Sequence, residues 1–195
     1  EECKKYDISI CHISTDYIYN AADKNSIKET DKIEPLSVYG KSKYEGEKRV
    51  QSVYDKFYIL RTSWMFGIYG INFFKWILET SKTADKINLI CDSYGCPTYS
   101  FDLAEIILKL IFSEKYGIYN VCNSDYTDWY NFGKYIIEKS HTKIEINKVT
   151  SEFLSRPAVR PKYSVMDNGK IQKALGIKIR CWKKAVDECI LNFER

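Results

Sequence analysis

Two apolar runs, separated by a long segment of helical composition, constrain the fold of this 195-residue chain more than any other feature. Asp7 to Ser14 (D-I-S-I-C-H-I-S) and Phe57 to Thr62 (F-Y-I-L-R-T) are rich in β-branched and aromatic residues, and each run stops at a polar cluster. Buried parallel strands have this composition, and ligands bind at their carboxyl ends. The lysine- and glutamate-rich stretch Val38 to Tyr54 predicts a helix that begins at residue 36 or 37. Together these segments predict a parallel strand–helix–strand crossover unit.

The rest of the chain continues this alternation of helices and strands. From Asp102 the apolar residues recur at helical spacing, and the helix is expected to end before Gly117. A short strand is predicted at residues 117–121, and a helix capped by Asp128 follows as far as Lys139. Residues 168–175 and 182–193 are expected to form the last helices. No repeat or flexible linker interrupts the pattern, which therefore indicates an α/β protein.

Charge and hydropathy narrow the classes of partner. The net charge is only +4, and the basic residues are scattered among acids, so the basic patch of a nucleic-acid-binding protein is missing. The most apolar stretch, Ala104 to Phe112, is interrupted by Glu105 and Lys109 and falls short of the roughly 20 apolar residues that span a membrane. The first residues have neither a signal-peptide pattern nor an initiator methionine. We therefore expect a small anionic substrate, and neither nucleic acid nor membrane as a partner.

The seven cysteines are odd in number and irregular in spacing, with Cys91 and Cys96 five residues apart as the closest pair. This usage favours reduced thiols in a cytoplasmic protein over a disulfide scaffold. His12 and His141 are the only histidines, and neither lies at ligand spacing from a cysteine pair. No metal site is predicted.

A tyrosine four residues before a lysine places both side chains on one face of a helix. The ammonium group then favours the phenolate, as a tyrosine that works as a general acid requires. Because the chain holds 16 tyrosines, the pattern alone is a weak signal. It occurs four times: Tyr39 with Lys43, Tyr44 with Lys48, Tyr130 with Lys134, and Tyr135 with Lys139.

Position separates these four pairs. Tyr39 lies in the first turn of the helix that follows the open end of the first strand, and Thr15 and Asp16 lie at that same end. The other three tyrosines lie deeper in their helices, where an amphipathic side chain beside a solvated lysine is the ordinary interpretation. The hydroxyl, the carboxylate and the tyrosine–lysine pair together predict a catalytic site at this edge of the sheet.

Five segments resemble one family in the same order along the chain. I-S-T-D-Y-I-Y (13–19), P-L-S-V-Y-G-K-S-K-Y-E-G-E (35–47) and L-R-T-S-W-M-F-G (60–67) are similar to consecutive signatures of the extended short-chain dehydrogenases. More narrowly they resemble the dTDP-4-dehydrorhamnose reductase family. D-S-Y-G-C-P-T (92–98) and R-P-K-Y-S-V-M-D (160–167) resemble later segments of that family, so the resemblance covers nearly the whole chain.

The resemblance implies a partial Rossmann-like, doubly wound parallel sheet with a small α/β substrate-binding lobe. Residues 1–65 would form the C-terminal part of the dinucleotide-binding domain. Residues 66–195 would form the substrate lobe, with elements that return to the Rossmann sheet.

The resemblance also implies the catalytic roles. Tyr39 would donate a proton to the C4 oxygen of a 4-keto nucleotide sugar while NADPH or NADH delivers hydride to C4. Lys43 would bind the nicotinamide ribose and favour the phenolate of Tyr39. Thr15 would hydrogen-bond the reacting oxygen, and the backbone at Ile13 would contact the cofactor.

Three further residues are expected to contact the substrate. Asp16 is followed by Tyr17, whereas nucleotide-sugar 4,6-dehydratases carry a glutamate at that point, so a reduction is favoured over loss of water. Trp64 matches a tryptophan that lies against the sugar or base of the substrate in the reductase family.

The glycine-rich turn that holds a dinucleotide's pyrophosphate does not occur in these 195 residues, so the preference for NAD or NADP cannot be read. We expect a fragment of a normal reductase. The alternatives are a non-catalytic binding or regulatory subunit with the reductase fold, as in the β-subunit of methionine adenosyltransferase, and a reductase of a related 4-keto-6-deoxy nucleotide sugar. A second copy of the chain is a candidate partner as a homodimer, covering the sheet edge that the missing strands would pair with.

Overall fold

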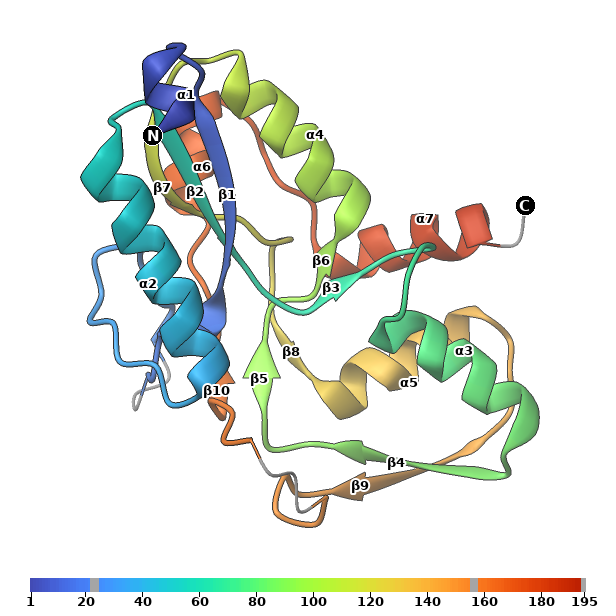
Figure 1. Cartoon of the computed structure of the whole chain (residues 1–195). Coiled ribbons are helices and arrows are strands. Elements are labelled where there is room, and N and C mark those ends of the chain that lie inside the picture. The colour runs from blue at the N-terminus through green and yellow to red at the C-terminus, as the bar shows by residue number, and fades with distance from the viewer. Residues whose placement is uncertain (22–24, 155–157, 194–195) are drawn as a thin grey trace.

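The computed structural model describes residues 1–21, 25–154 and 158–193, and a three-stranded parallel sheet lies at its centre. The strand order is β1 (Ile10–Thr15), β2 (Phe57–Thr62) and β7 (Gly117–Asn120). In the register of β1 and β2, Thr15 lies opposite Thr62, so the two strands end at the same edge of the sheet. The three strands lie between α2 and α4 in Figure 1. The predicted α/β class and parallel sheet are confirmed.

The predicted crossover unit is also present. Helix α2 (Val38–Val53) connects β1 to β2 and packs against both strands. Ser37 caps the helix by accepting a hydrogen bond from the backbone N–H of Gly40. The first strand starts at Ile10 and not at Asp7 as predicted. A short helix, α1 (Glu2–Lys5), precedes Asp7. Asp7 itself has a left-handed backbone (φ 53°), a conformation that an extended strand cannot include.

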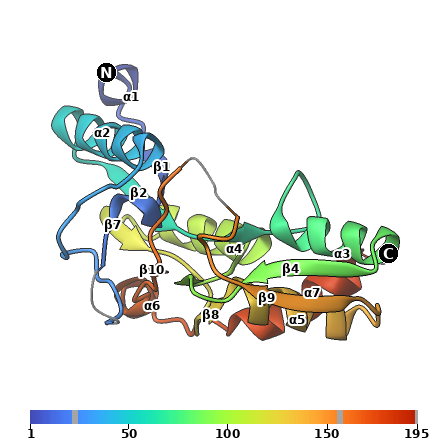
Figure 2. The ribbon, with the colours of Figure 1, turned by 90° about the horizontal axis from the view of Figure 1, so that it is seen from below.

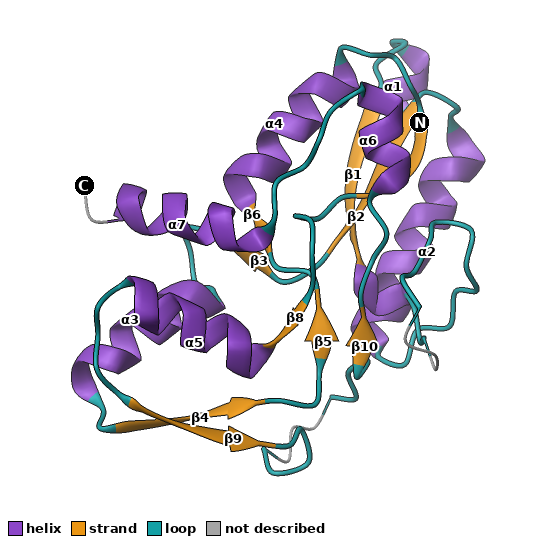
Figure 3. Cartoon of the chain, turned by 180° about the vertical axis from the view of Figure 1, so that it is seen from behind, coloured by secondary structure: helices purple, strands orange, loops and turns teal. Residues whose placement is uncertain are grey.

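Two other helices cover the sheet with apolar side chains. Helix α4 (Ser100–Ile111) begins two residues before the predicted start, and α6 is Gly169–Leu175. Figure 3 shows both helices from behind. Leucines and isoleucines of α4 and α6 form one buried cluster with side chains in or near β2 and β7. Its buried members are Tyr58, Leu60, Leu103, Ile106, Leu110, Tyr119, Val121, Ile171 and Ile179.

A second lobe is built from three helices and a two-stranded parallel sheet. The strands are β4 (Lys86–Ile90) and β9 (Glu145–Val149), which run side by side in Figures 1 and 2. The helices are α3 (Phe73–Thr83), α5 (Trp129–Lys139) and α7 (Trp182–Phe193). Asp128 caps α5 as predicted, by accepting from the N–H of Asn131. Helix α3 and strands β4 and β9 were not predicted from the sequence.

Short strands connect the sheet to this lobe. β3 (Met65–Phe66) pairs with β6 (Thr98–Tyr99), and β5 (Tyr94–Gly95) lies between β8 (Thr127–Asp128) and β10 (Tyr163–Ser164). A 3-10 helix, η1 (Asp16–Ile18), follows β1 directly. These elements hold the carboxyl ends of β1 and β2 close to the second lobe. Among the described residues, no helix is long and apolar enough to cross a membrane.

Candidate active site

Thr15 and Asp16 lie where β1 ends and η1 begins. The Thr15 hydroxyl donates to Oδ1 of Asp16 (3.1 Å) and accepts from the backbone N–H of Tyr17 (3.2 Å). Thr15 therefore caps η1, and its hydroxyl orientation is fixed from two sides. The structure brings the predicted hydroxyl and carboxylate together at the carboxyl edge of the sheet.

Asp16 is more deeply buried than its predicted contact with the substrate implies. The residue is 2% exposed, and among the described residues its Oδ2 atom has no hydrogen-bond partner. Burial raises the pKa of Asp16 to about 6, and hydrogen bonds from the Ser164 and Thr15 hydroxyls oppose the rise. The carboxylate therefore lies behind Thr15, and in this arrangement it reaches the site through the Thr15 hydroxyl.

Tyr39 and Lys43 occupy successive turns of α2, and each contacts a residue that lies two positions from Thr15 in the chain. Tyr39 is 54% exposed, and its ring meets the edge of the Tyr17 ring at a centroid distance of 5.9 Å. The Lys43 ammonium donates to the carbonyl oxygen of Ile13 (2.5 Å), which fixes the lysine to β1. The ammonium group has three N–H donors, so this bond leaves capacity for a ligand. Lys43 therefore lies against β1, and Tyr39 lies against η1, the element that follows Thr15 directly.

Gly40 explains how α2 comes so close to η1. A Cβ atom at this position would lie 2.2 Å from the carbonyl oxygen of Tyr17, a separation that no side chain can occupy. The glycine directly after Tyr39 therefore permits the contact between the helix and η1. Any larger residue would push the first turn of α2, with Tyr39 on it, away from β1.

The other three tyrosine–lysine pairs have different contacts, although the expectation that all three tyrosines lie deeper in their helices is wrong for Tyr130, the second residue of α5. The Tyr44 ring lies under Lys48 at 5.2 Å, and the Tyr130 ring lies under Lys148 at 4.6 Å. The Tyr135 hydroxyl donates to Asp187 (2.9 Å), and burial together with this bond raises its pKa to about 12. These contacts favour the interpretation that the three tyrosines are structural.

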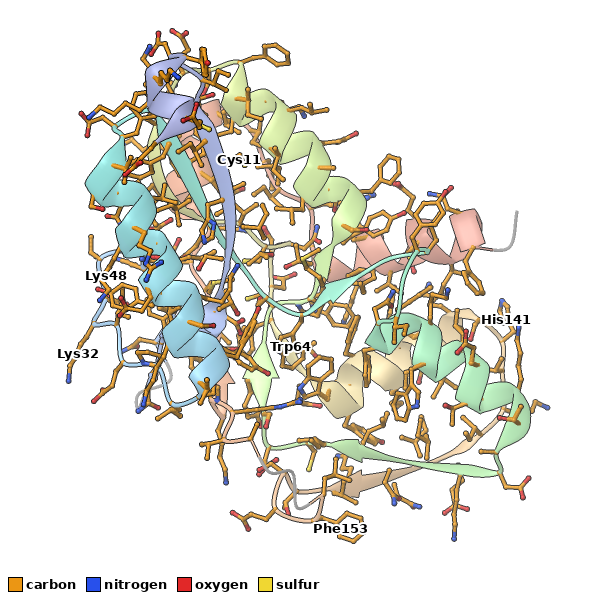
Figure 4. The ribbon with its side chains drawn as sticks, viewed as in Figure 1. Cys11, Lys32, Lys48, Trp64, His141 and Phe153 are labelled. Atoms are coloured by element: carbon orange, nitrogen blue, oxygen red, sulfur yellow. The ribbon has the colours of Figure 1, made fainter. Side chains whose placement is uncertain are left out.

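Trp64 lies between the sheet and the second lobe, as Figure 4 shows. Its ring is stacked on Trp129 of α5, with centroids 3.7 Å apart and planes 11° apart. A Cβ atom at Gly95 would lie 2.5 Å from the indole, so the glycine leaves room for the ring. Trp64 has a left-handed backbone (φ 45°), which is strained for a non-glycine residue. The surrounding packing therefore holds Trp64 in a defined position.

A cleft of about 270 Å³ lies beside these rings. Tyr17, Trp64 and Trp129 line one part of it, and Arg160 and Lys162 add basic groups. Lys162 also pairs with Asp92 (3.5 Å) and Glu152 (3.3 Å). Tyr17 connects the cleft to the catalytic edge, because its ring also touches Tyr39. An aromatic wall with nearby cations suits a ligand that combines a ring with negative charge.

Sequence reasoning missed several residues of this site. Trp129 and Gly95 fix the position of Trp64, and Glu47 and Arg61 form a buried ion pair behind Lys43. The only available signal was the spacing of Glu47, four residues after Lys43 on the same helix face. Nothing in the local sequence indicates that Trp129 meets Trp64.

All seven cysteines carry free thiols. No three histidine, cysteine or acidic side chains gather closely enough to hold a metal ion in residues 1–21, 25–154 and 158–193.

Comparisons with known proteins point to one family. The family model described as "RmlD substrate binding domain" matches residues 1–195. The spore coat polysaccharide biosynthesis protein SpsK of Bacillus subtilis is 40% identical over 177 residues, which is 91% of this chain and 62% of that protein. The dTDP-4-dehydrorhamnose reductase of Aggregatibacter actinomycetemcomitans is 38% identical, over 95% of this chain and 67% of that protein.

A solved structure agrees closely with this fold. The crystal structure of dTDP-4-dehydrorhamnose reductase from Bacillus anthracis in complex with NADP has a TM-score of 0.94 and 31% identity. The match covers 97% of this chain and 68% of that one. The chain therefore spans about two thirds of the length of the proteins it resembles, 62% in the case of the Bacillus subtilis protein.

Proposed function

Because this chain belongs to the RmlD substrate-binding domain family, we propose that the longer protein reduces the C4 keto group of dTDP-4-dehydro-L-rhamnose to give dTDP-L-rhamnose. The reductant is NADPH or NADH. The observation that carries the proposal is that α2 holds Lys43 on Ile13 of β1 and Tyr39 against Tyr17, two residues after Thr15, while Tyr17 also lines the cleft.

The residues present fit the reactive end of a nicotinamide cofactor. Lys43 donates to Ile13 through one N–H and has others to offer to ribose hydroxyls, and Tyr39 is exposed beside it. The glycine turn for the pyrophosphate does not occur in these residues, so only this end of the cofactor can be assigned. When bound, the nicotinamide supplies hydride to C4 of the sugar.

Side chains of this chain donate the proton and stabilise the charge that the donation leaves. Tyr39 donates it to the C4 oxygen, and Lys43 stabilises the phenolate that remains. The Thr15 hydroxyl has a single O–H, which donates to Asp16 in this structure, so it hydrogen-bonds the same oxygen only after this proton turns from Asp16 to the substrate. A direct contact between Asp16 and the substrate stays a prediction, because its carboxylate is buried.

The cleft provides the rest of the binding energy. Trp64 and Tyr17 lie against the sugar or base, and Arg160 and Lys162 face the diphosphate. We also propose that the boundary near residue 65 separates the dinucleotide-binding part from the substrate part. A cytoplasmic location and a homodimer complete the proposal.

The test is turnover by the protein with its upstream region, using dTDP-4-dehydro-L-rhamnose with NADH and with NADPH. Loss of absorbance at 340 nm together with dTDP-L-rhamnose as the product would support the proposal. Reduction of a different 4-keto-6-deoxy nucleotide sugar alone would move the assignment to that sugar. Binding of ligands without any reduction would favour the non-catalytic subunit.

A further inference from the structure

Helix α2 carries three functional groups along one stripe. Tyr39, Lys43 and Glu47 are spaced by four residues, so they lie on the same face of successive turns. Tyr39 is exposed, Lys43 is partly buried, and Glu47 is fully buried at 0% exposure. Glu47 lies about 12 Å along the helix axis from Tyr39 at 1.5 Å per residue. The buried end of this stripe, at Glu47, is therefore anchored inside the protein, and the exposed end, at Tyr39, lies at the site.

Glu47 binds both strands of the crossover unit. Its carboxylate accepts from the Ser14 hydroxyl of β1 (2.5 Å). It also accepts two charge-assisted bonds from the Arg61 guanidinium of β2, at 3.1 Å from Nε and 2.7 Å from Nη2. Arg61 is 1% exposed, so this ion pair is shielded from water. A bidentate pair of this kind fixes orientation as well as distance.

Arg61 extends the connection to the loop after η1. Its Nη1 atom donates to the Tyr19 hydroxyl (2.6 Å) and to the carbonyl oxygen of Glu29 (3.1 Å). Burial and the positive charge of Arg61 act in opposite directions on Tyr19, and burial dominates, raising its pKa to about 12. The buried groups thus join α2, β1, β2 and the loop that continues from Thr15 and Tyr17.

A buried ion pair of this kind is weak evidence for stability. Removing two charges from water costs several kcal/mol per ion, and well-packed apolar residues of the same size often serve equally well or better. Apolar contacts, however, tolerate a small slide of a helix along a sheet, whereas short charged hydrogen bonds do not. The arrangement therefore has the properties of a device that fixes register.

We propose that Glu47 and Arg61 are positioning residues that set the axial register of α2 and so place Tyr39 and Lys43 relative to Thr15. Gly40 against the Tyr17 carbonyl and Lys43 on the Ile13 carbonyl limit the helix at its other end. The inference rests on the proposed function, because Tyr39 and Lys43 are its catalytic groups. Misplacement of a reacting group by about 1 Å can lower a rate by roughly 100-fold.

The test uses the protein that includes its upstream region, and it compares several variants of that protein. Glu47→Gln leaves the Arg61 charge unpaired and is the direct variant, but it is at risk of unfolding. Glu47→Leu combined with Arg61→Met removes the ion pair and keeps an apolar core, so it keeps the test valid if the single variant fails. Asp102→Asn is the matched control. Asp102 forms an ion pair with Arg180, with an N–O distance of 2.6 Å, and this ion pair lies away from the catalytic edge of the sheet.

Two readouts are combined. We expect the double variant to lower kcat by about 100-fold with KM within about three-fold, as a positioning role requires. In 3-fluorotyrosine-labelled protein, the ¹⁹F resonance of Tyr39, assigned by loss in Tyr39→Phe, should shift, while those of Tyr130 and Tyr135 stay in place. Asp102→Asn should change neither readout.

The outcomes separate the two proposals. A folded double variant with unchanged kcat and an unmoved Tyr39 resonance overturns the positioning role. If the wild-type protein reduces no nucleotide sugar, the proposed function fails, and the ¹⁹F readout still decides whether Glu47 and Arg61 place Tyr39. Partial return of kcat and of the Tyr39 resonance in Arg61→Lys, relative to the double variant, would support the role of the charge.

Discussion

The two parts of the molecule hold their functional side chains by different means. In the β1–α2–β2 unit, short polar contacts fix Thr15 and Lys43, with Glu47 and Arg61 buried beneath them. Between the sheet and the second lobe, Trp64 is held by stacking on Trp129 of α5. Proton transfer needs groups within hydrogen-bond distance, whereas contact with a sugar or base depends mainly on buried area. The difference indicates directional contacts where chemistry is expected and aromatic packing where binding is expected.

The largest effect should come from testing the 195-residue chain alone. Without a glycine turn, Lys43 cannot replace the backbone N–H groups that meet a pyrophosphate, so we expect no turnover and no tight binding of NAD(P)H. In the described sheet β1 pairs only with β2, which leaves an apolar edge that should cause dimerisation or aggregation. Light scattering with NADH fluorescence titration measures both. A clean monomer that binds NADH at micromolar concentration contradicts this prediction.

The next largest effect should come from removing the proposed proton donor of the β1–α2–β2 unit. In the protein with its upstream region, Tyr39→Phe should lower kcat at least about 100-fold, because it removes the general acid, and substrate binding should change little. Steady-state kinetics with both substrates measure this. Phenylalanine at Tyr44, Tyr130 or Tyr135 should leave kcat within a few-fold. An inactive Tyr44→Phe variant would mean that the wrong tyrosine of α2 has been assigned.

Variants of Asp16 measure how much the burial of a carboxylate in the β1–α2–β2 unit lowers the free energy of unfolding. Its pKa is raised to about 6 by burial, so the folded state binds a proton more tightly than the unfolded chain does. The stability of the wild type should therefore fall as pH rises from about 4 to about 6, and the penalty should be complete above that. Asp16→Asn should remove this slope, a difference of up to about 3 kcal/mol at pH 7.

Urea denaturation at several pH values measures the slope in the protein with its upstream region. The exposed Asp7 is the control, since its hydrogen bonds from Lys56 and Tyr54 lower its pKa. The stability that Asp7 contributes is present above its unfolded pKa and is lost as pH falls below it. Asp7→Asn should therefore leave the slope between pH 4 and 6 intact. The same slope in wild type and Asp16→Asn would show that Asp16 is not its source.

The smallest effect concerns the stacked side chains of Trp64 and Trp129. Trp64→Ala should raise KM for the nucleotide sugar by about ten-fold, in line with the loss of an aromatic contact, with a smaller change in NAD(P)H affinity. Trp129→Ala should act in the same direction, because it removes both the support of Trp64 and a side chain that lines the cleft. Calorimetric binding of both ligands measures the two affinities. Equal losses for both ligands would indicate general structural damage, and the comparison between the two parts would then fail.

The crossover unit could be predicted because its signals are local. Strand composition, the Ser37 cap and the four-residue spacing of Tyr39 and Lys43 each follow from a few consecutive residues. The same holds for the Asp128 cap of α5. The ordered segments that resemble one family supplied the basis for the proposed reaction, which local periodicity cannot supply.

The second lobe could not be predicted in the same way. Strands β4 and β9 pair across almost 60 residues of chain, and neither has a run long enough to mark it as a strand by itself. Trp64 and Trp129 meet only because β2 and α5 converge. The burial of Asp16 likewise depends on Ser164, which arrives from β10.

The sequence by itself therefore determined the α/β class, the crossover unit and the residues placed at the end of its first strand. The tertiary structure alone decided which tryptophan supports Trp64, how deeply Asp16 is buried, and that Glu47 of α2 meets Arg61 of β2. Periodicity and capping act over a few residues, so they are written in local sequence. Burial and buried charge pairs depend on segments far apart in the chain, and their energies arise only when those segments pack together.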